Sequence, residues 1–577
     1  MSVEAAELTS KKDVPNMGIG EVLTGAEIML RCLILEQTEF VFGYPGGAVL
    51  PIYDSLYSSH LNHVLTRHEQ GAIHAADGYA RATGRPGVVI ATSGPGATNL
   101  VTGIATAQMD SVPLVCITGN VPQNLIGTDA FQEANITGIT LPITKHNYFV
   151  RDVRDLAKII KEAFHIATTG RPGPVLVDIP KDVSNAKCVF EYPDSVQIRG
   201  YKETHVPTDE SIQEFISAIS GAKKPVIMAG GGIMAANAHA ELQEFAEKSR
   251  IPVINTFMGL GGFPGTHELA LGMPGMHGSY AANHALLQAD CVIALGARFD
   301  DRITMGRTKD FAPNARIVHV DIDPAELGKN VNTYVKVTGD VKSTLQKALP
   351  HVAACDSDEW IKQLAKWKAE IPYRYAKGEM LKPQEVIEHL YETTKGEAIV
   401  TTDVGQHQMW VAQYYKFQNA RSLISSGGLG TMGFGFPAAI GAQFAYPERT
   451  VIAVVGDGGF QMTNQELAIA AQFNLPIKIA IINNQCLGMV RQWQQIFYKK
   501  RYSQVDLTFS PDYLKLAEAF GVKGLRATTL EEAKAVWAEA LAHDGPVVID
   551  FQVESEESVF PMVAPGNTLD QMVMGDE

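Results

Sequence analysis

Short apolar runs alternate with longer segments of helical periodicity along almost the whole chain. Runs of this kind are typical of buried parallel strands, because helices cover both faces of such a sheet. They fall into three sets: 41–45, 87–94, 113–119 and 173–180; then 224–232, 251–257, 290–298 and 315–323; then 398–405, 450–458, 477–484 and 545–553. The alternation predicts an α/β protein with three doubly wound parallel-sheet domains.

The stretches between the three sets indicate the domain boundaries. A polar, irregular stretch follows the first set, and a charged helical segment follows the second. We therefore expect a disordered N-terminus, a first domain, a linker, a central domain, a connector, a third domain and a C-terminal arm. Their expected bounds are 1–20, 21–187, 188–208, 209–350, 351–382, 383–553 and 554–577.

The first and third sets end on nearly the same string. GPVLVDI occupies 173–179 and GPVVIDF occupies 545–551, each after an Ala-rich helical pattern. Two apolar strings of this kind match easily by chance, so the match alone is weak. Together with the similar block lengths it indicates a duplicated α/β domain on either side of a different central one.

Composition narrows the class of protein. The 577 residues are 46% hydrophobic and 19% charged, which is typical of a well-packed globular protein. The net charge of −15 argues against nucleic acid or an anionic membrane as the main partner. No apolar run approaches the ~20 residues that a membrane span needs. The six cysteines lack CxxC spacing and the N-terminus lacks the features of a targeting signal, so we expect a cytoplasmic protein.

The segment from Val454 to Asn484 carries the most specific chemistry. One apolar run ends at Asp457 between two glycines, a helical stretch follows, and the next apolar run ends at Asn484. In a right-handed strand–helix–strand unit both side chains emerge at the same carboxyl edge of the sheet. A carboxylate and an amide oxygen suit Mg²⁺, which also binds phosphate oxygens. The flanking Gly456 and Gly458 let backbone amides approach a diphosphate closely.

This arrangement resembles the cofactor motif of the thiamine-diphosphate-dependent enzymes. Over nearly the whole chain the sequence is similar to the catalytic subunits of the acetohydroxyacid synthase (acetolactate synthase) family. The matching strings are GYPGGA (43–48), RHEQG (67–71), VPQNLIGTDAFQE (121–133), PITKHN (142–147), RPGPVLVDIPKD (171–182), MGLGGFP (258–264), GMHG (275–278), ARFDDR (297–302), GDGGF (456–460) and NNQCLGMVRQWQ (483–494). The resemblance implies a domain for the pyrimidine of thiamine diphosphate, a central FAD-binding domain and a domain for the diphosphate with Mg²⁺.

Glu69 begins a helical pattern directly after an apolar run. By itself it is typical of a first-turn glutamate, which the helix dipole favours. The resemblance instead implies a carboxylate that hydrogen-bonds the aminopyrimidine of the cofactor and so promotes proton loss from its thiazolium carbon. It further implies that Asp457, Asn484 and the backbone carbonyl of Cys486 hold Mg²⁺.

The resemblance also implies substrate contacts. Gln132 lines the site, Lys181 lies near it, and Arg302 grips the carboxylate of a 2-oxo acid. Without the family pattern, Arg302 is typical of a surface residue in a charged loop. Trp493 supplies a flat apolar wall, which fits the ethyl group of 2-oxobutanoate better than the methyl group of pyruvate. Arg491 is assigned no role.

Two larger sets of residues are implied to contact the cofactors. For thiamine diphosphate they are Glu69, Gly405, Gln406, His407, Gly430, Met432, Gly458, Gly459, Leu487, Gly488 and Met489. For FAD they are Arg171, Gly231, Gly232, Met276, His277, Arg298, Asp300, Asp321 and Asp340. Met432 is expected to wedge between the two rings of the thiamine cofactor and to bend it.

The implied reaction is a carboligation of 2-oxo acids. Pyruvate is decarboxylated and its hydroxyethyl unit passes to pyruvate, giving 2-acetolactate, or to 2-oxobutanoate, giving 2-aceto-2-hydroxybutanoate. Both products lead to branched-chain amino acids, and the flavin has no net redox role. Active sites in this family form between subunits, which implies a homodimer or a higher oligomer. Members commonly bind a small regulatory subunit.

Other functions fit the residues less well. An FAD-dependent pyruvate oxidase or a glyoxylate carboligase shares the fold, but Glu69 counts against the carboligase, and Trp493 with Arg302 counts against the oxidase. A catalytically silent binding protein would not need every catalytic position to be filled. An NAD-dependent dehydrogenase would need GxGxxG after a domain's first strand and a suitably spaced acid, which none of the three blocks has.

Overall fold

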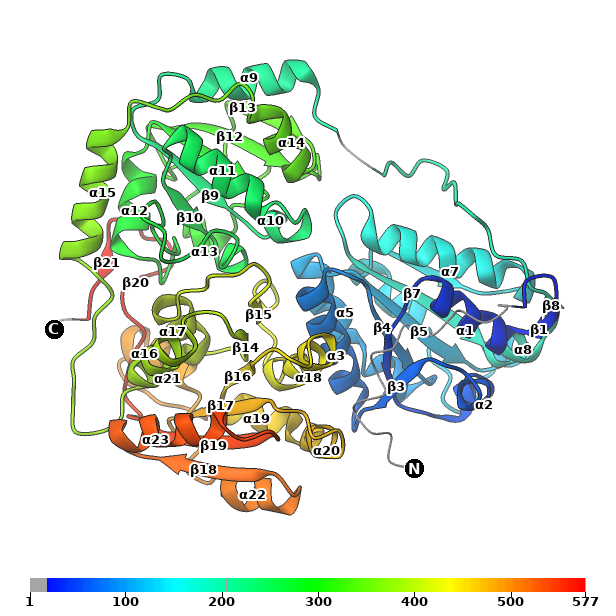
Figure 1. Cartoon of the computed structure of the whole chain (residues 1–577). Helices are drawn as coiled ribbons and strands as arrows, with labels where there is room; N and C mark the ends of the chain where they lie inside the picture. Colours follow the sequence, from blue (N-terminus) through cyan, green and yellow to red (C-terminus); the bar gives the residue numbers. More distant parts are fainter. Residues whose placement is uncertain (1–17, 204–205, 576–577) are drawn as a thin grey trace.

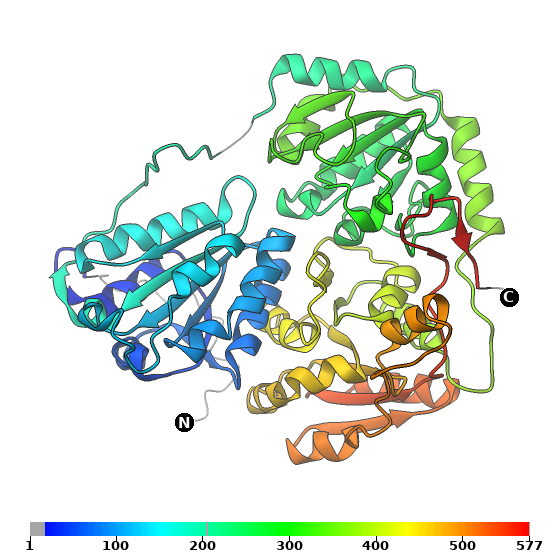
Figure 2. The ribbon, with the colours of Figure 1, turned by 180° about the vertical axis from the view of Figure 1, so that it is seen from behind.

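Residues 18–203 and 206–575, which the computed structural model describes, form three α/β lobes (Figure 1). Each lobe is built around one parallel sheet with helices packed on it, which confirms the predicted fold class. Figure 2 shows the same lobes from behind, with the described part of the predicted linker, up to residue 203, leading away from the N-terminal lobe. Of the segment predicted to be disordered, residues 1–17 lie outside the described residues.

The N-terminal lobe has a six-stranded parallel sheet in the order β3-β2-β4-β5-β7-β6. Its strands are β2 (Phe40–Gly43), β3 (Asn62–Leu65), β4 (Gly87–Ala91), β5 (Leu114–Asn120), β6 (His146–Phe149) and β7 (Pro174–Pro180). Its helices are α1 (Gly25–Leu35), α2 (Leu50–Tyr57), α3 (Glu69–Thr83), α4 (Pro95–Thr98), α5 (Val101–Asp110), α6 (Ile136–Thr140), α7 (Val153–Thr168) and α8 (Lys181–Asn185). The central strands are fully buried, as expected for a sheet covered on both faces.

The central lobe has a five-stranded parallel sheet in the order β10-β9-β11-β12-β13. Its strands are β9 (Pro225–Ala229), β10 (Val253–Asn255), β11 (Cys291–Leu295), β12 (Arg316–Asp321) and β13 (Val335–Thr338). Its helices are α9 (Asp209–Ile219), α10 (Gly232–Ala235), α11 (His239–Ser249), α12 (Tyr280–Gln288), α13 (Asp301–Thr304), α14 (Val341–Ala348) and α15 (Asp358–Glu370). The segment predicted as a charged connector, 351–382, contains α15, which packs against α12.

The C-terminal lobe has a six-stranded parallel sheet in the order β15-β14-β16-β17-β19-β18. Its strands are β14 (Ile399–Thr402), β15 (Leu423–Ser425), β16 (Val451–Gly456), β17 (Lys478–Asn483), β18 (Lys523–Ala527) and β19 (Val547–Gln552). Its helices are α16 (Pro383–Thr394), α17 (Gln406–Tyr414), α18 (Gly435–Ala445), α19 (Asp457–Thr463), α20 (Leu467–Gln472), α21 (Gly488–Phe497), α22 (Tyr513–Ala519) and α23 (Leu530–Leu541). The 3₁₀ helix η6 (Asn464–Glu466) joins α19 to α20.

The first and last sheets have the same strand order, with β7 and β19 in equivalent positions. These are the two strands that carry the matching GPVLVDI and GPVVIDF strings. The shared topology supports the hypothesis of a duplicated domain, because chance similarity of two apolar strings would not place them equivalently in two sheets.

The hydrophobic pattern failed to predict four strands: β6, β13, β15 and β18. All four lie at the edge of a sheet, where a strand has one neighbour instead of two and needs fewer apolar side chains. The pattern also missed β8 (Lys187–Val189), which lies at the start of the stretch expected to be irregular and pairs antiparallel with β1 (Val22–Thr24). In the expected C-terminal arm, β20 (Met562–Val563) pairs with β21 (Met572–Val573).

Helices α3 and α18 pack side by side and join the N- and C-terminal lobes (Figure 1). Their backbones approach closely because the contact is made by glycines. A Cβ at Gly78 would lie 2.1 Å from the carbonyl oxygen of Ala438, and one at Gly441 would lie 1.8 Å from that of Ala75. One hydrophobic core continues across this contact from one lobe into the other.

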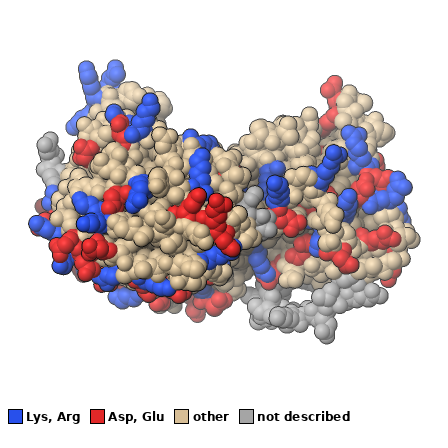
Figure 3. Space-filling model, turned by 90° about the horizontal axis from the view of Figure 1, so that it is seen from above, with Lys and Arg blue, Asp and Glu red and all other residues tan. Residues whose placement is uncertain are grey.

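The face shown in Figure 3 carries acidic and basic side chains that are interspersed, without a large area of one sign. Within the part of the chain that the structure describes, none of the helices is long and apolar enough to cross a bilayer.

Candidate active site

The metal residues predicted from the sequence lie on neighbouring strands of the C-terminal sheet. Asp457 begins α19 directly after β16, and Asn484 directly follows β17, which pairs in parallel with β16. Both residues are therefore at the carboxyl edge, where the strand–helix–strand spacing predicts them. Both are buried, with exposed fractions of 2% and 6%.

The Asp457 carboxylate is suited to a cation. Its Oδ1 accepts the N–H of Gly458 at 2.9 Å, while its buried Oδ2 has no hydrogen-bond partner among the described residues. Burial raises the pKa of Asp457 to about 7. A bound Mg²⁺ would supply the charge compensation that this oxygen lacks and would favour the ionised form. The described residues contain no cluster of three or more His, Cys, Asp or Glu that could hold a metal. The expected set needs none, because its other two ligands are amide and main-chain oxygens.

The glycines at this edge are surrounded closely by neighbouring atoms. A Cβ at Gly458 would lie 2.9 Å from Leu487, and one at Gly488 would lie 2.0 Å from Oε1 of Gln406. The same Gln406 oxygen accepts a hydrogen bond from Asn484 at 3.2 Å. These short distances show that a side chain at either glycine would displace residues expected to hold the metal and the diphosphate.

His407 lies in the first turn of α17, beside Gly405 and Gly456. Its buried Nε2 atom has no hydrogen-bond partner in the part of the chain that the structure describes, and burial lowers the pKa of the ring to about 4. The imidazole is therefore neutral near pH 7 and has one ring nitrogen free to interact with a ligand.

The loop that carries Met432 runs from β15 to α18 and is held by the N-terminal lobe. The buried carboxylate of Asp110 accepts the N–H groups of Gly427 and Gly428 at 2.9 and 2.8 Å, and it also pairs with Arg81 at 3.0 Å. Sequence reasoning missed this role of Asp110, because nothing in the local pattern links α5 with a loop more than three hundred residues away.

Glu69 lies at the carboxyl edge of the N-terminal sheet, as the first residue of α3. Its Oε2 accepts a hydrogen bond from Asn99 at 2.9 Å, and a Cβ at Gly96 would lie 3.2 Å from its Oε1. Gln132 packs on the same turn, because its backbone and Cβ lie 2.8–2.9 Å from where a Cβ of Gly94 would be. Glu69 and Gln132 are thus brought to one turn, while Asp457 and Asn484 share the edge of a different sheet.

In a comparison with known proteins, family models match both lobes that carry the candidate site, the N-terminal lobe with Glu69 and the C-terminal lobe with Asp457. Models of thiamine pyrophosphate enzymes match as an N-terminal TPP binding domain at 23–139, a central domain at 212–348 and a C-terminal TPP binding domain at 403–551. The acetolactate synthase large subunit of Corynebacterium glutamicum is 50% identical over 584 residues, covering 98% of this chain and 93% of that protein. The chain belongs to the acetolactate synthase large-subunit family. Similar relatives include the isozyme 3 large subunit of Escherichia coli (46% identical; 96% and 98% covered) and the large subunit of Lactococcus lactis (49%; 95% and 96%).

The matched models place thiamine diphosphate binding in the two lobes that carry Glu69 and Asp457. As in other members of the acetolactate synthase family, the chain is an enzyme of the transferase type and the catalytic subunit. The roles assigned above to individual residues remain predictions.

Two residues expected at the substrate, Trp493 and Arg302, lie where the central and C-terminal lobes meet. Trp493 packs against the hydrophobic cluster that contains Met276, and the Arg302 guanidinium lies 3.7 Å from the sulfur of Met276. Arg302 is 60% exposed and pairs only loosely, at 3.5 Å, with Asp301. Its side chain is therefore available to an anion.

The C-terminal arm covers this junction. The Gln492 side chain exchanges two hydrogen bonds with the backbone of Val559, at 3.0 and 2.9 Å, and Arg491 donates to the carbonyl of Glu557 at 2.7 Å. Arg491, to which no role was assigned, thus fixes the arm to α21.

Lys181 begins α8 directly after β7, at the carboxyl edge of the N-terminal sheet.

Several residues expected to bind FAD have structural partners. The Asp300 side chain caps α13, and the Asp340 side chain caps α14. Arg171 reaches from the N-terminal lobe and pairs with Asp323 and Glu326 of the central lobe at 3.2 and 2.9 Å. Asp321 ends β12, and burial raises its pKa to about 6.

The glycine run at 230–232 packs against the end of β11. A Cβ at Gly230 or Gly232 would lie 2.2 or 2.6 Å from backbone atoms of Gly296. These glycines are thus required for a close approach of two backbone turns, and a cofactor contact by Gly231 and Gly232 stays a prediction.

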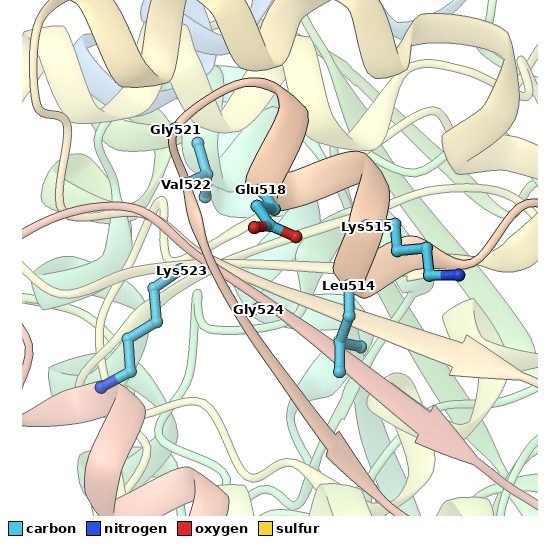
Figure 4. A pocket seen from close by; sticks show the side chains of 7 residues that line it. All are labelled: Leu514, Lys515, Glu518, Gly521, Val522, Lys523 and Gly524. Atoms are coloured by element: carbon cyan, nitrogen blue, oxygen red, sulfur yellow. The ribbon is translucent and has the colours of Figure 1, made fainter.

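A surface pocket of about 440 Å³ lies between α22 and the start of β18 (Figure 4). Its charged side chains are Lys515, Glu518 and Lys523. Because Lys523 is the first residue of a strand parallel to the rest of the sheet, the pocket is at the amino edge, opposite Asp457. It is not part of the candidate active site.

Proposed function

We propose that this chain decarboxylates pyruvate and transfers the hydroxyethyl unit to pyruvate or to 2-oxobutanoate, in branched-chain amino-acid biosynthesis. The observation that carries the proposal is the buried, unpartnered Oδ2 of Asp457 beside Asn484, in a lobe that matches a thiamine pyrophosphate binding domain. Relatives of about 50% identity that are named acetolactate synthase large subunits support it over nearly the full chain.

Asp457, Asn484 and the carbonyl of Cys486 would hold Mg²⁺, which in turn would bind the diphosphate. Close glycine packing at Gly458 and Gly488 would bring backbone N–H groups to the phosphate oxygens. Thiamine diphosphate, when bound, supplies the electron sink for decarboxylation. The protein contributes position and electrostatics.

Glu69 would accept or donate the proton that the cofactor's pyrimidine exchanges. Asn99 donates to one oxygen of Glu69 and leaves the other for the ring nitrogen. This hydrogen bond fixes the orientation of the carboxylate, which is the property that a proton-transferring group needs. Glutamine could not replace it, because an amide does not take up the proton.

Substrate selection would depend on Arg302 and Trp493. The exposed Arg302 guanidinium would bind the carboxylate of a 2-oxo acid. Trp493 and Met276 would form an apolar wall that gains more contact from the ethyl group of 2-oxobutanoate than from the methyl group of pyruvate, a gain of about 1 kcal/mol for one methylene. Gln132 and Lys181 would line the same space from the N-terminal lobe.

We propose that FAD binds the central lobe without a net redox role. The contacts would come from the set predicted from the sequence, which includes Arg171, Arg298 and Asp321. Burial raises the pKa of Asp321 to about 6 although the charge of Arg171 opposes this rise, so the carboxyl would gain from hydrogen bonds with ribose or adenine groups.

We also propose that the active unit is a homodimer or a higher homo-oligomer, with Glu69 of one copy completing the diphosphate site of another. Phe131, which precedes Gln132 in the chain, is 88% exposed, and Leu141 of the same lobe is 69% exposed. Apolar side chains this exposed are typical of an interface, so a second copy of this chain would cover them.

All six cysteines are free thiols, which supports a cytoplasmic location. A small regulatory subunit is a further expected partner.

The decisive experiment supplies the purified protein with Mg²⁺, thiamine diphosphate, FAD, pyruvate and 2-oxobutanoate, and quantifies the products by mass spectrometry. We expect mostly 2-aceto-2-hydroxybutanoate with some 2-acetolactate. Acetate that depends on an electron acceptor would instead indicate a pyruvate oxidase. The Glu69→Gln variant is the matched control, because it should bind Mg²⁺ normally and form little product.

A further inference from the structure

Glu466 is a fully buried carboxylate at the contact between the N- and C-terminal lobes. Its two oxygens accept the backbone N–H of Arg67 in the other lobe at 3.3 and 3.1 Å, and the two residues are 399 positions apart in the chain. The carboxylate therefore lies at the N-terminal end of α3, where the helix dipole stabilises negative charge.

The third residue of α3, Gly71, provides the space for this carboxylate. A Cβ at Gly71 would lie 2.2 Å from Oε1 of Glu466 and 2.6 Å from its Cδ. Glu69 lies between Arg67 and Gly71. The residues on either side of Glu69 are thus held by one side chain that comes from the other lobe.

Glu466 is also connected to the metal edge. It ends η6, which directly follows α19, and Asp457 is the first residue of α19. One continuous segment, 457–466, therefore touches the expected Mg²⁺ site at one end and the start of α3 at the other.

We propose that Glu466 is a positioning residue for Glu69. It holds the start of α3 from the neighbouring lobe and so determines where the activating carboxylate lies. This inference rests on the proposed function, in which Glu69 of one copy serves the diphosphate edge of another. A change at Glu466 would consequently impair the site to which its own chain contributes Glu69, and not the site built on its own C-terminal lobe.

Hybrid dimers of two differently tagged chains test this assignment. In the first hybrid, one chain carries Glu466→Gln and the other carries Asp457→Asn. The only intact diphosphate edge then faces a Glu69 whose Glu466 is normal, and we expect the activity of a reference hybrid of wild type and Asp457→Asn. In the second hybrid, one chain carries both substitutions and the other is wild type. Its intact edge faces the altered α3, and we expect about tenfold lower kcat than in the reference.

Two further measurements separate positioning from a loss of stability. Calorimetric titration should show the same affinity for Mg²⁺ and thiamine diphosphate in both hybrids, because the diphosphate edge is intact in each. The Gly71→Ala substitution displaces the Glu466 carboxylate from the α3 side. When Gly71→Ala is used in place of Glu466→Gln in both hybrids, the first hybrid should again keep the reference activity and the second should again lose it. Glu27→Gln is the matched control, because Glu27 is also a carboxylate at a helix start and its hydrogen bonds go to Thr24, in the capping box of α1.

Equal activity in the two hybrids would overturn the assignment. Failure of the proposed function has a different signature: wild-type protein would form no carboligation product. Failure of the inter-subunit arrangement would also be recognisable, because the two hybrids would then lose activity in the opposite order.

Discussion

The N- and C-terminal sheets have one strand order but different chemistry at their carboxyl edges. The C-terminal edge has a buried carboxylate without a partner, Asp457, next to glycines that tolerate no side chain. The N-terminal edge has Glu69, whose carboxylate accepts a hydrogen bond from Asn99. One framework thus supports two roles: anchoring a metal and a diphosphate at one edge, and moving a proton at the other.

A second difference lies inside the two sheets. Asp178 on β7 and Asp550 on β19 occupy equivalent positions, and each accepts a hydrogen bond from an asparagine at the end of the neighbouring strand, Asn120 or Asn483. Asp550 also pairs with Arg526 at 2.9 Å, whereas Asp178 has only the hydroxyl of Thr118 as its second donor. Without a cation, burial raises the pKa of Asp178 to about 7.

The largest expected effect comes from removing the proton-transferring group. Glu69→Gln should lower kcat by roughly 10²–10⁴-fold, because an amide cannot exchange a proton with the pyrimidine. Affinity for thiamine diphosphate and Mg²⁺ should change little, since that edge is untouched. Steady-state kinetics measures the loss of kcat, and calorimetry measures the affinity for thiamine diphosphate and Mg²⁺. A parallel loss of affinity would show that the two edges do not divide the work as proposed.

Removing the expected metal ligand Asp457 should have the opposite effect: Mg²⁺ affinity should fall, and activity should be partly recoverable. Asp457→Asn leaves an amide where Mg²⁺ needs a charged ligand, so we expect roughly a 100-fold loss of Mg²⁺ affinity. Activity should recover in part when Mg²⁺ and cofactor are raised, in contrast to Glu69→Gln. Titration of Mg²⁺ in the presence of excess cofactor measures the Mg²⁺ affinity of the variant. Unchanged Mg²⁺ affinity would exclude Asp457 as a ligand.

The buried aspartates should respond differently to neutralisation. Asp550→Asn removes a charge-assisted bond to Arg526 and should lower the free energy of unfolding by about 1–3 kcal/mol near pH 7. Asp178→Asn resembles the protonated form that the fold already favours, so at pH 5 it should change the stability by less than about 1 kcal/mol.

The pH dependence of Asp178 has a definite sign. A carboxyl whose folded pKa lies near 7 binds more protons in the folded state than in the unfolded one between about pH 4 and 7, so the wild type loses stability as the pH rises through this window. The Asp178→Asn variant lacks this loss. Its free energy of unfolding relative to wild type should rise from pH 4 to pH 7, as measured by denaturant titration. A constant difference would show that Asp178 titrates normally.

The smallest effects should come from glycines at the two edges. Gly488→Ala puts a Cβ 2.0 Å from Gln406, beside Asn484, and should weaken Mg²⁺ binding several-fold. Gly47→Ala, near the N-terminal edge, meets nothing within 4 Å and should change stability by less than about 0.5 kcal/mol. Equal effects of the two variants would show that the glycine packing at the C-terminal edge is adaptable.

Much of the fold is predictable because buried parallel strands leave a strong local signal. The run from Val451 to Gly456 is fully buried, and its apolar residues reveal it as a strand. The edge strand Lys523–Ala527 is only partly buried, so its sequence, KGLRA, carries no such signal. Short strands at an edge are decided by the neighbour with which they pair.

The candidate site was predictable in its parts. Asp457 and Asn484 could be placed at one edge because the strand–helix–strand unit that carries them is local in the chain. Asp110 and Glu466 could not be found in this way. Each is an ordinary acidic residue in its own helix, and its role depends on backbone N–H groups of a distant lobe.

Local patterning therefore predicted the three-sheet architecture and the edge at which Asp457 and Asn484 lie, because strand burial and turn chemistry act over a few residues. The family was indicated by the resemblance of short sequence motifs. Tertiary structure decided how the lobes hold one another: α3 against α18, the arm on α21, and the two acidic residues that cap backbone segments across the lobe contact. The physical reason is that a buried hydrogen bond between distant segments needs only one donor and one acceptor. Such a pair leaves no periodic trace in either segment.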